Sequence, residues 1–243
     1  MKNIITLFLP GTMLLFFTLA CDQSVNRTRL TKQDSIYYQL GSKTPFTGTA
    51  FAQYETGRQK FQGTFKSGKQ TGKQLYWFIN GQIKKELSFE NGLLEGKTLF
   101  WHWNGQKKEE LFYNSDNQHG KSVSWHENGQ KSTEVFFEHG KLKDEFLAWN
   151  VEGGLVEQAF YENGKLSGTR TTWYSNGQKA EEAAFKNGLI VGKFCSWYDN
   201  GQKKIEGSYR NGKKDGKFIT WFWYGGVMSE EYFVNGKIRP LHP

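Results

Sequence analysis

The chain has 243 residues, a formal net charge of +8 and a mean hydropathy of −0.70. It contains 28 glycines, 20 phenylalanines, 11 tyrosines and 9 tryptophans but 4 prolines. Such aromatic content excludes a disordered chain, which buries too little apolar surface to need it. The many glycines indicate short strands joined by frequent turns.

The first twenty residues differ in character from all that follow. Lys2 is the only charged residue before Asp22, and the segment between them is mostly apolar. A basic start and a short apolar stretch predict a signal peptide over residues 1–20. Thr18-Leu19-Ala20-Cys21 resembles a lipobox, although Thr18 stands where leucine is usual. The resemblance implies acylation of Cys21 and a lipid anchor in the cell envelope, in either the inner or the outer membrane.

The second cysteine is Cys195, and lipidation of Cys21 leaves it without an intramolecular partner. The sequence therefore predicts a fold without a disulfide. Cys195 stands in a column of apolar residues, which predicts a small buried hydrophobe, not a nucleophile.

Beyond residue 47 the chain repeats every 24 residues, which identifies a repeat architecture. One column carries tryptophan in seven units: Trp77, Trp101, Trp125, Trp149, Trp173, Trp197 and Trp221. A second column is aromatic in all eight units: Phe65, Phe89, Tyr113, Phe137, Tyr161, Phe185, Tyr209 and Phe233. Three positions depart from the rule of their columns: Gln53, Asp116 and Asp144.

Each unit has two turn signals and two aromatic-bearing stretches, which predicts one β-hairpin per unit. In the second unit, a three-residue turn ending at Gly81 pairs Trp77 with Ile83 and puts the apolar sets of both strands on one face. Because a one-residue slip turns every side chain over, this register is the consistent one. We therefore expect the tryptophan and the phenylalanine/tyrosine columns to share a face, with the recurring Lys84 and Glu86 positions on the other.

The expected fold is all-β: an elongated, twisted, largely single-layer antiparallel meander of tandem hairpins. The predicted organisation is a signal peptide (1–20), an acylated N-terminus with linker and cap segment (21–44), eight hairpin repeats (45–239) and a tail (240–243).

The units Gly-Lys-x-x-x-Trp-x-x-Asn-Gly-Gln and Phe-x-Asn-Gly-Lys resemble MORN-type repeats. They are most similar to the MORN-variant repeats of bacterial proteins described as antitoxin components of toxin–antitoxin systems. The resemblance covers residues 35–239. It implies the hairpin-repeat fold and, for function, an antitoxin or immunity role toward a partner toxin.

The candidate binding face is a column of aromatic and polar residues on the side expected to lie opposite the tryptophans. Its members are Tyr54, Phe78, His102, His126, Tyr174, Tyr198 and Phe222. His102 and His126 lie two strands apart, about 9.5 Å, which is too far to share one metal ion. We expect no metal and no cofactor.

Glutamate recurs in one column at Glu86, Glu110, Glu134, Glu182, Glu206 and Glu230. Carboxylates one repeat apart have the spacing that glycoside hydrolysis needs. A catalytic site occurs once in a protein, however, whereas this glutamate recurs in six equivalent positions. Lys–Glu pairing explains it better. We expect no enzyme and no nucleic-acid binding.

The leading functional hypothesis is a membrane-anchored scaffold that binds a protein or an envelope polymer through one sheet face. The alternatives are an antitoxin or immunity protein and, least favoured, a cell-wall glycan hydrolase. An uncovered apolar face would mark an interaction site. A second copy of the chain could also cover that face, which would give a homodimer through the aromatic face.

Overall fold

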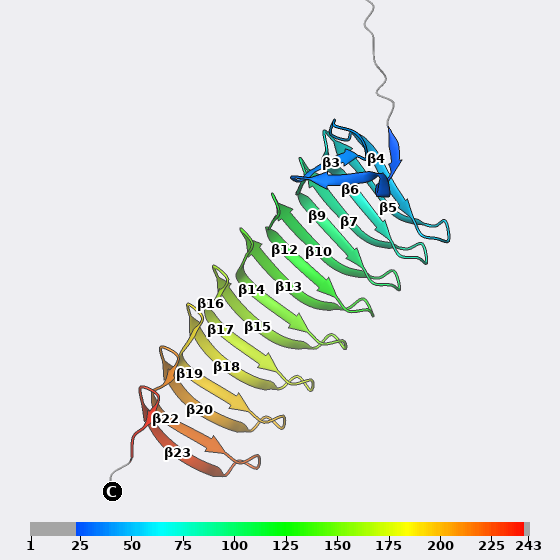
Figure 1. The fold of residues 1–243 in the computed structure, drawn as a ribbon. Coiled ribbons are helices and arrows are strands. Elements are labelled where there is room, and N and C mark those ends of the chain that lie inside the picture. Colours follow the sequence, from blue (N-terminus) through cyan, green and yellow to red (C-terminus); the bar gives the residue numbers. More distant parts are fainter. Residues whose placement is uncertain (1–22, 241–243) are drawn as a thin grey trace, which may run out of the picture.

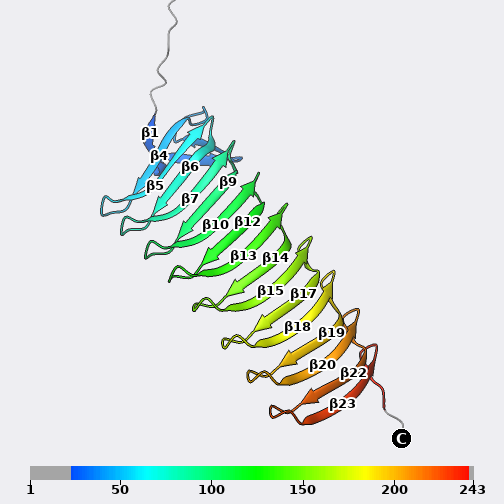
Figure 2. The same ribbon diagram turned by 180° about the vertical axis from the view of Figure 1, so that it is seen from behind.

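A computed structural model describes residues 23–240, and the predicted signal peptide and Cys21 lie outside these residues. Most of the described chain forms one long sheet whose strands follow one another in chain order from the N-terminal to the C-terminal end (Figure 1). The opposite view shows the same single layer (Figure 2). No helix in residues 23–240 is long and apolar enough to cross a bilayer. The elongated, mostly antiparallel meander is confirmed.

Each repeat contributes a first and a second long strand. The first strands are β4 (Gly48–Gln53), β6 (Lys69–Trp77), β9 (Gly96–Trp101), β12 (Gly120–Trp125), β14 (Lys141–Trp149), β17 (Gly168–Trp173), β19 (Leu189–Trp197) and β22 (Gly216–Trp221). The second strands are β5 (Gln59–Lys66), β7 (Ile83–Glu90), β10 (Lys107–Asn114), β13 (Lys131–Glu138), β15 (Leu155–Glu162), β18 (Lys179–Lys186), β20 (Lys203–Arg210) and β23 (Val227–Val234).

Five two-residue strands follow the second turns: β8 (Leu93–Leu94), β11 (Asn117–Gln118), β16 (Lys165–Leu166), β21 (Lys213–Lys214) and β24 (Lys237–Ile238). Each of the first four is separated from the next long strand by one residue. The break falls where the backbone bulges, at a position with positive φ such as Gly96 (+76°). Asp144 takes the same conformation, with φ of +60°, where the other units have glycine.

The first turn of each hairpin has the predicted three-residue loop. In the second repeat the Phe78 amide donates to the Gln82 carbonyl (2.8 Å), and Gly81 has φ of +94°. Asn80 also links this turn to the next one, since its side-chain amide donates to the Trp103 carbonyl (3.2 Å). The second turn is shorter: Glu90 pairs with Leu93 across Asn91 and Gly92, both of which have positive φ. That mirror-type two-residue turn matches the twist of the strands.

The predicted distribution of columns between the two faces is wrong beyond the first pair. Trp77 does oppose Ile83, but Tyr76 then opposes Lys85, so Lys84 is an extra residue in the second strand. A bulge of this kind turns all later side chains over relative to the partner strand. The same skip occurs in all eight hairpins.

The two faces therefore differ from the expected ones. The tryptophan face carries the tryptophan column with the columns of Leu75 and Glu86, since Leu75 opposes Glu86. The phenylalanine face carries the columns of Phe89, Leu87 and Gln74, since Gln74 opposes Leu87. The column of Tyr54 and Phe78 also lies on the phenylalanine face, which holds most of the fully buried side chains.

The N-terminal segment closes one end of the array. Strand β1 (Ser24–Asn26) pairs in parallel with β4, and a 3-10 turn, η1 (Arg27–Arg29), follows it. Strands β2 (Leu30–Gln33) and β3 (Ile36–Gln39) form a separate hairpin that lies across the first strands (Figure 1). Beneath it is the main buried cluster: Val25, Phe46, Ala50, Phe61 and Phe65.

Candidate functional site

The candidate binding column stands one position after the end of the first strands, on the phenylalanine face, and its members are half-buried. Tyr174 and Tyr198 donate their hydroxyls to the carbonyls of Trp197 and Trp221 one repeat further on, each at 2.8 Å. Tyr54 does the same to Trp77. These hydrogen bonds join each repeat to the next. Lys60 and Lys204 lie over the rings of Tyr54 and Tyr198.

The histidines of the column make the equivalent hydrogen bond to the next repeat. His102 and His126 place Nε2 at 2.9 Å from the carbonyls of Trp125 and Trp149. Phe78 packs instead on Trp103, with ring centroids 5.0 Å apart, and Phe222 stacks on Tyr224 at 5.2 Å. Sequence reasoning did not foresee that His119 and His139 would meet, with ring centroids 5.9 Å apart. Within residues 23–240 no group of three or more His, Cys, Asp or Glu side chains is placed to hold a metal ion.

A groove of about 340 Å³ opens beside Tyr174 on the phenylalanine face. Tyr174 and Phe194 supply its aromatic wall, and Glu181 supplies a carboxylate. The hydroxyl of Ser196 also lines it; this residue is 5% exposed, and its Oγ has no hydrogen-bond partner among residues 23–240. A buried hydroxyl without a partner costs free energy. A ligand hydroxyl or amide placed in the groove would remove that cost.

The glutamate column forms ion pairs on the tryptophan face. Glu134 accepts from Lys121 at 2.5 Å and from Lys131 at 2.7 Å, and the hydrogen bond from Lys121 is the largest cause that lowers its pKa. Lys131 also lies over the ring of Trp149, 5.6 Å from its centroid. The expected Lys–Glu pairing is present, but it shares a face with the tryptophans.

The same lysine–tryptophan–glutamate arrangement recurs along the array, so no single carboxylate pair is distinguished from the others. The lysine stems cover the tryptophan rings that would otherwise face solvent. Lysine ammonium groups lie over Trp125, Trp149, Trp197 and Trp221.

Cys195 is buried on this face and opposes Glu206, with its thiol 3.8 Å from that carboxylate. Burial is the largest cause that raises the pKa of the thiol. A raised pKa leaves little thiolate, so the setting does not activate Cys195 as a nucleophile.

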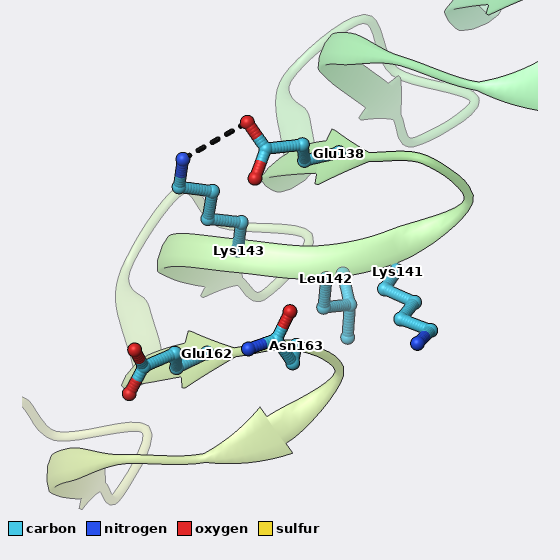
Figure 3. Close-up of a pocket in the computed structure, with 6 residues that line it drawn as sticks. All are labelled: Glu138, Lys141, Leu142, Lys143, Glu162 and Asn163. Atoms are coloured by element: carbon cyan, nitrogen blue, oxygen red, sulfur yellow. Dashed lines mark hydrogen bonds and ion pairs between the residues drawn. The ribbon is translucent and has the colours of Figure 1, made fainter.

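A hollow of about 180 Å³ lies along β14 in the irregular fifth repeat, beside the ends of β13 and β15. Its lining residues are Glu138, Lys141, Leu142, Lys143, Glu162 and Asn163 (Figure 3). In Figure 3 the side chains of Glu138 and Lys143 point toward one another, and they form an ion pair of 3.0 Å. Opposite charges thus already neutralise one another here.

The fold and these surfaces define a tandem hairpin-repeat protein with an extended surface and several shallow grooves. Four segments match the family model described as MORN repeat variant: residues 70–91, 118–139, 166–187 and 190–211. Each segment spans the two long strands of one hairpin: β6 and β7, β12 and β13, β17 and β18, and β19 and β20. No curated protein matches the chain.

Proposed function

We propose that the chain is a lipid-anchored, non-enzymatic scaffold of the cell envelope that binds a protein or an envelope polymer through its phenylalanine face. MORN-type repeats are scaffold modules, and a repeat array offers an extended surface without a singular cleft. The lipobox-like Thr18-Leu19-Ala20-Cys21 supports the anchor.

The observation that carries the proposal is the groove beside Tyr174. It combines two aromatic rings, the Glu181 carboxylate and the unpartnered Ser196 hydroxyl. Aromatic surface with a few converging polar groups is the usual composition of a recognition site.

Capture from solubilised envelope extracts tests the binding role, with Glu181→Gln as the groove variant. Glu182→Gln is the matched control, because the adjacent residue lies on the tryptophan face and opposes Cys195. We expect the parent and Glu182→Gln to retain the same partner and Glu181→Gln to lose most of it. Equal recovery with all three, or no specific partner for the parent, would overturn the proposal.

The anchor is tested separately by growth with a labelled fatty acid. The parent should incorporate label and Cys21→Ala should not. Label in both variants would exclude Cys21 as the acylated residue, whatever the outcome of the capture experiment.

An antitoxin or immunity role is the alternative that the repeat resemblance supports. It requires a toxic product that this chain neutralises. Co-expression with the product of an adjacent gene tests it: restored growth favours this alternative, and a harmless neighbour removes its basis.

A further inference from the structure

A pocket of about 400 Å³ lies where the N-terminal segment folds back onto the first two repeats. Its walls come from the end of β1, from η1 and from β4, β5 and β6. The lining residues are Asn26, Arg27, Thr28, Ala52, Gln53, Lys60, Phe61 and Tyr76. Sequence reasoning gave this region only a capping role.

Arg27 is held over the pocket by local structure. The Asn26 side chain accepts from the Thr28 amide (3.0 Å) and fixes the start of the 3-10 turn. The Arg27 guanidinium then lies 4.1 Å from the ring centroid of buried Phe61. Its one hydrogen bond within residues 23–240 is to the Tyr76 hydroxyl at 3.4 Å. A guanidinium has five N–H donors in a fixed fork, so most of them remain free.

Further positive charge surrounds the same rings. Lys85 lies 4.3 Å from the ring centroid of Tyr76, and Arg27 lies 5.7 Å from it. The two charges are therefore within about 10 Å of each other, roughly the Debye length at 0.1 M salt. Lys60 completes the group from the neighbouring strand.

None of these cations is neutralised. Among residues 23–240 no carboxylate lies within 4.0 Å of Arg27, Lys60, Lys84 or Lys85. On the tryptophan face, by contrast, lysines such as Lys97 and Lys121 pair with glutamates. Burial, followed by the charges of Lys84 and Arg27, lowers the pKa of Lys85. The pocket therefore holds uncompensated positive charge against apolar walls.

We propose that this pocket binds a phosphate group, with Arg27 as the bidentate donor and Lys85 and Lys60 as flanking charges. A planar guanidinium fork matches two phosphate oxygens, and ammonium groups complete the neutralisation. Backed by Phe61, Arg27 is held in place before binding, which reduces the entropy lost on binding.

Two sources could present the phosphate: a lipid headgroup, or a phosphate outside the membrane. Arg27 stands six positions after Cys21, a stretch of chain that spans at most about 20 Å. An anchor at Cys21 would thus keep the pocket near the lipid headgroups. Phosphate binding at this pocket does not depend on the proposed partner-binding role, because it is measured on the purified chain without a protein partner.

The test measures the melting temperature of the acylated chain in neutral detergent, with tryptophan fluorescence as readout. Sodium phosphate and glycerol 3-phosphate are titrated against sodium chloride at equal ionic strength. A ligand that binds the folded state raises the melting temperature in a saturable manner. We expect both phosphates, but not chloride, to do so.

The variants Arg27→Gln and Lys85→Met should each weaken the apparent affinity for phosphate at least tenfold. Lys85→Met keeps the apolar stem on Tyr76, so it separates loss of charge from loss of packing. Lys97→Gln is the matched control, since it removes one charge from an ion-paired lysine on the other face. It should respond to phosphate as the parent does.

A second arm distinguishes the sources by placing the chain in phosphatidylcholine vesicles with or without phosphatidylglycerol. A rise in melting temperature with phosphatidylglycerol that Arg27→Gln abolishes assigns the headgroup as ligand. A response to soluble phosphate alone assigns a phosphate outside the membrane. No response of the parent to phosphate, an equal response to chloride, or an undiminished response in Arg27→Gln and Lys85→Met overturns the site.

Discussion

In several hairpins, opposed residues on the phenylalanine face compensate one another in size. Thr98 opposes Leu111, and Ser122 opposes Val135, so the smaller residue is on the first strand. The order reverses in the fifth and seventh repeats, where Phe146 opposes Ala159 and Phe194 opposes Gly207. Close packing explains this, because the space beneath each pair is fixed by the neighbouring repeats.

Exchanging one pair for another in the same chain tests this compensation. Ala159 is fully buried, so Ala159→Val should lower the free energy of unfolding by about 1–3 kcal/mol through overpacking. Phe146 is half-buried, so Phe146→Ser should lower it by about 1–3 kcal/mol through the apolar contact that is lost. The double variant recreates the Ser122–Val135 pair of the preceding repeat.

Denaturant unfolding of both single variants and the double variant measures the coupling. The double variant should lose at least about 1 kcal/mol less than the sum of the single losses, as expected for contacting residues. Strict additivity would show that the two side chains do not share one space.

The hydrogen bonds from the tyrosine hydroxyls to the next repeat give a second prediction at the residue scale. Tyr198→Phe removes the hydroxyl that donates to the Trp221 carbonyl but keeps the ring. The free energy of unfolding should fall by about 0.5–1.5 kcal/mol, the net value of one hydrogen bond. Phe78 stands in the same column and has no hydroxyl, so the column accepts phenylalanine without this hydrogen bond. An unchanged unfolding midpoint for Tyr198→Phe would show that this hydrogen bond makes no net contribution to the free energy of unfolding.

At the scale of the element, strand pairs are joined on the tryptophan face by Lys–Glu ion pairs. Hydrogen bonds from Lys97 and Lys121 on the first strands are the largest causes that lower the pKa values of Glu110 and Glu134 on the second strands. A carboxyl whose folded-state pKa is lowered stabilises the fold above its unfolded pKa, near 4.3, and loses that contribution as the pH falls through the folded value.

The melting temperature should therefore drop as the pH falls below about 4.3, the ordinary glutamate pKa. Glu134→Gln should be less stable than the parent at pH 7 and should lose less of its stability on acidification. High salt should narrow the difference at pH 7, since these pairs are partly exposed to solvent. Parallel curves for parent and variant across the acid range would contradict the assignment.

At the scale of the whole molecule, each repeat contacts mainly its neighbours, so the array behaves as a one-dimensional stack. Deletion of residues 120–143 removes one full repeat and joins equivalent backbone positions. The shortened chain should fold, and its maximum dimension in small-angle scattering should fall by about 10 Å, two strands at about 4.8 Å each.

Deletion of twelve residues, 120–131, is the matched control, because it removes one strand and breaks the antiparallel alternation. This variant should lose cooperative unfolding or aggregate. Equal stability of the two deletions would show that the 24-residue unit is not the folding module.

The sequence sufficed for several features that depend on local chemistry. The period placed the strands, and the Asn-Gly pairs placed turns such as that ending at Gly81, because glycine adopts positive φ at little cost. The exceptions Asp116 and Asp144 keep that positive φ, at +66° and +60°. Aspartate is among the residues that tolerate it best, so the irregular sequence still gives a regular backbone.

The sequence by itself determined the all-β hairpin array, the unit of 24 residues and the three-residue first turn. Only the tertiary structure decided which side chains share a face, because one bulged residue in each second strand reverses them. The bulge positions are Lys60, Lys84, Lys108, Ser132, Val156, Ala180, Lys204 and Met228, which have no chemistry in common. The proposed phosphate pocket likewise needed the folded chain, since Arg27 joins Lys85 at the Tyr76 ring only when the N-terminal turn packs on the first repeats.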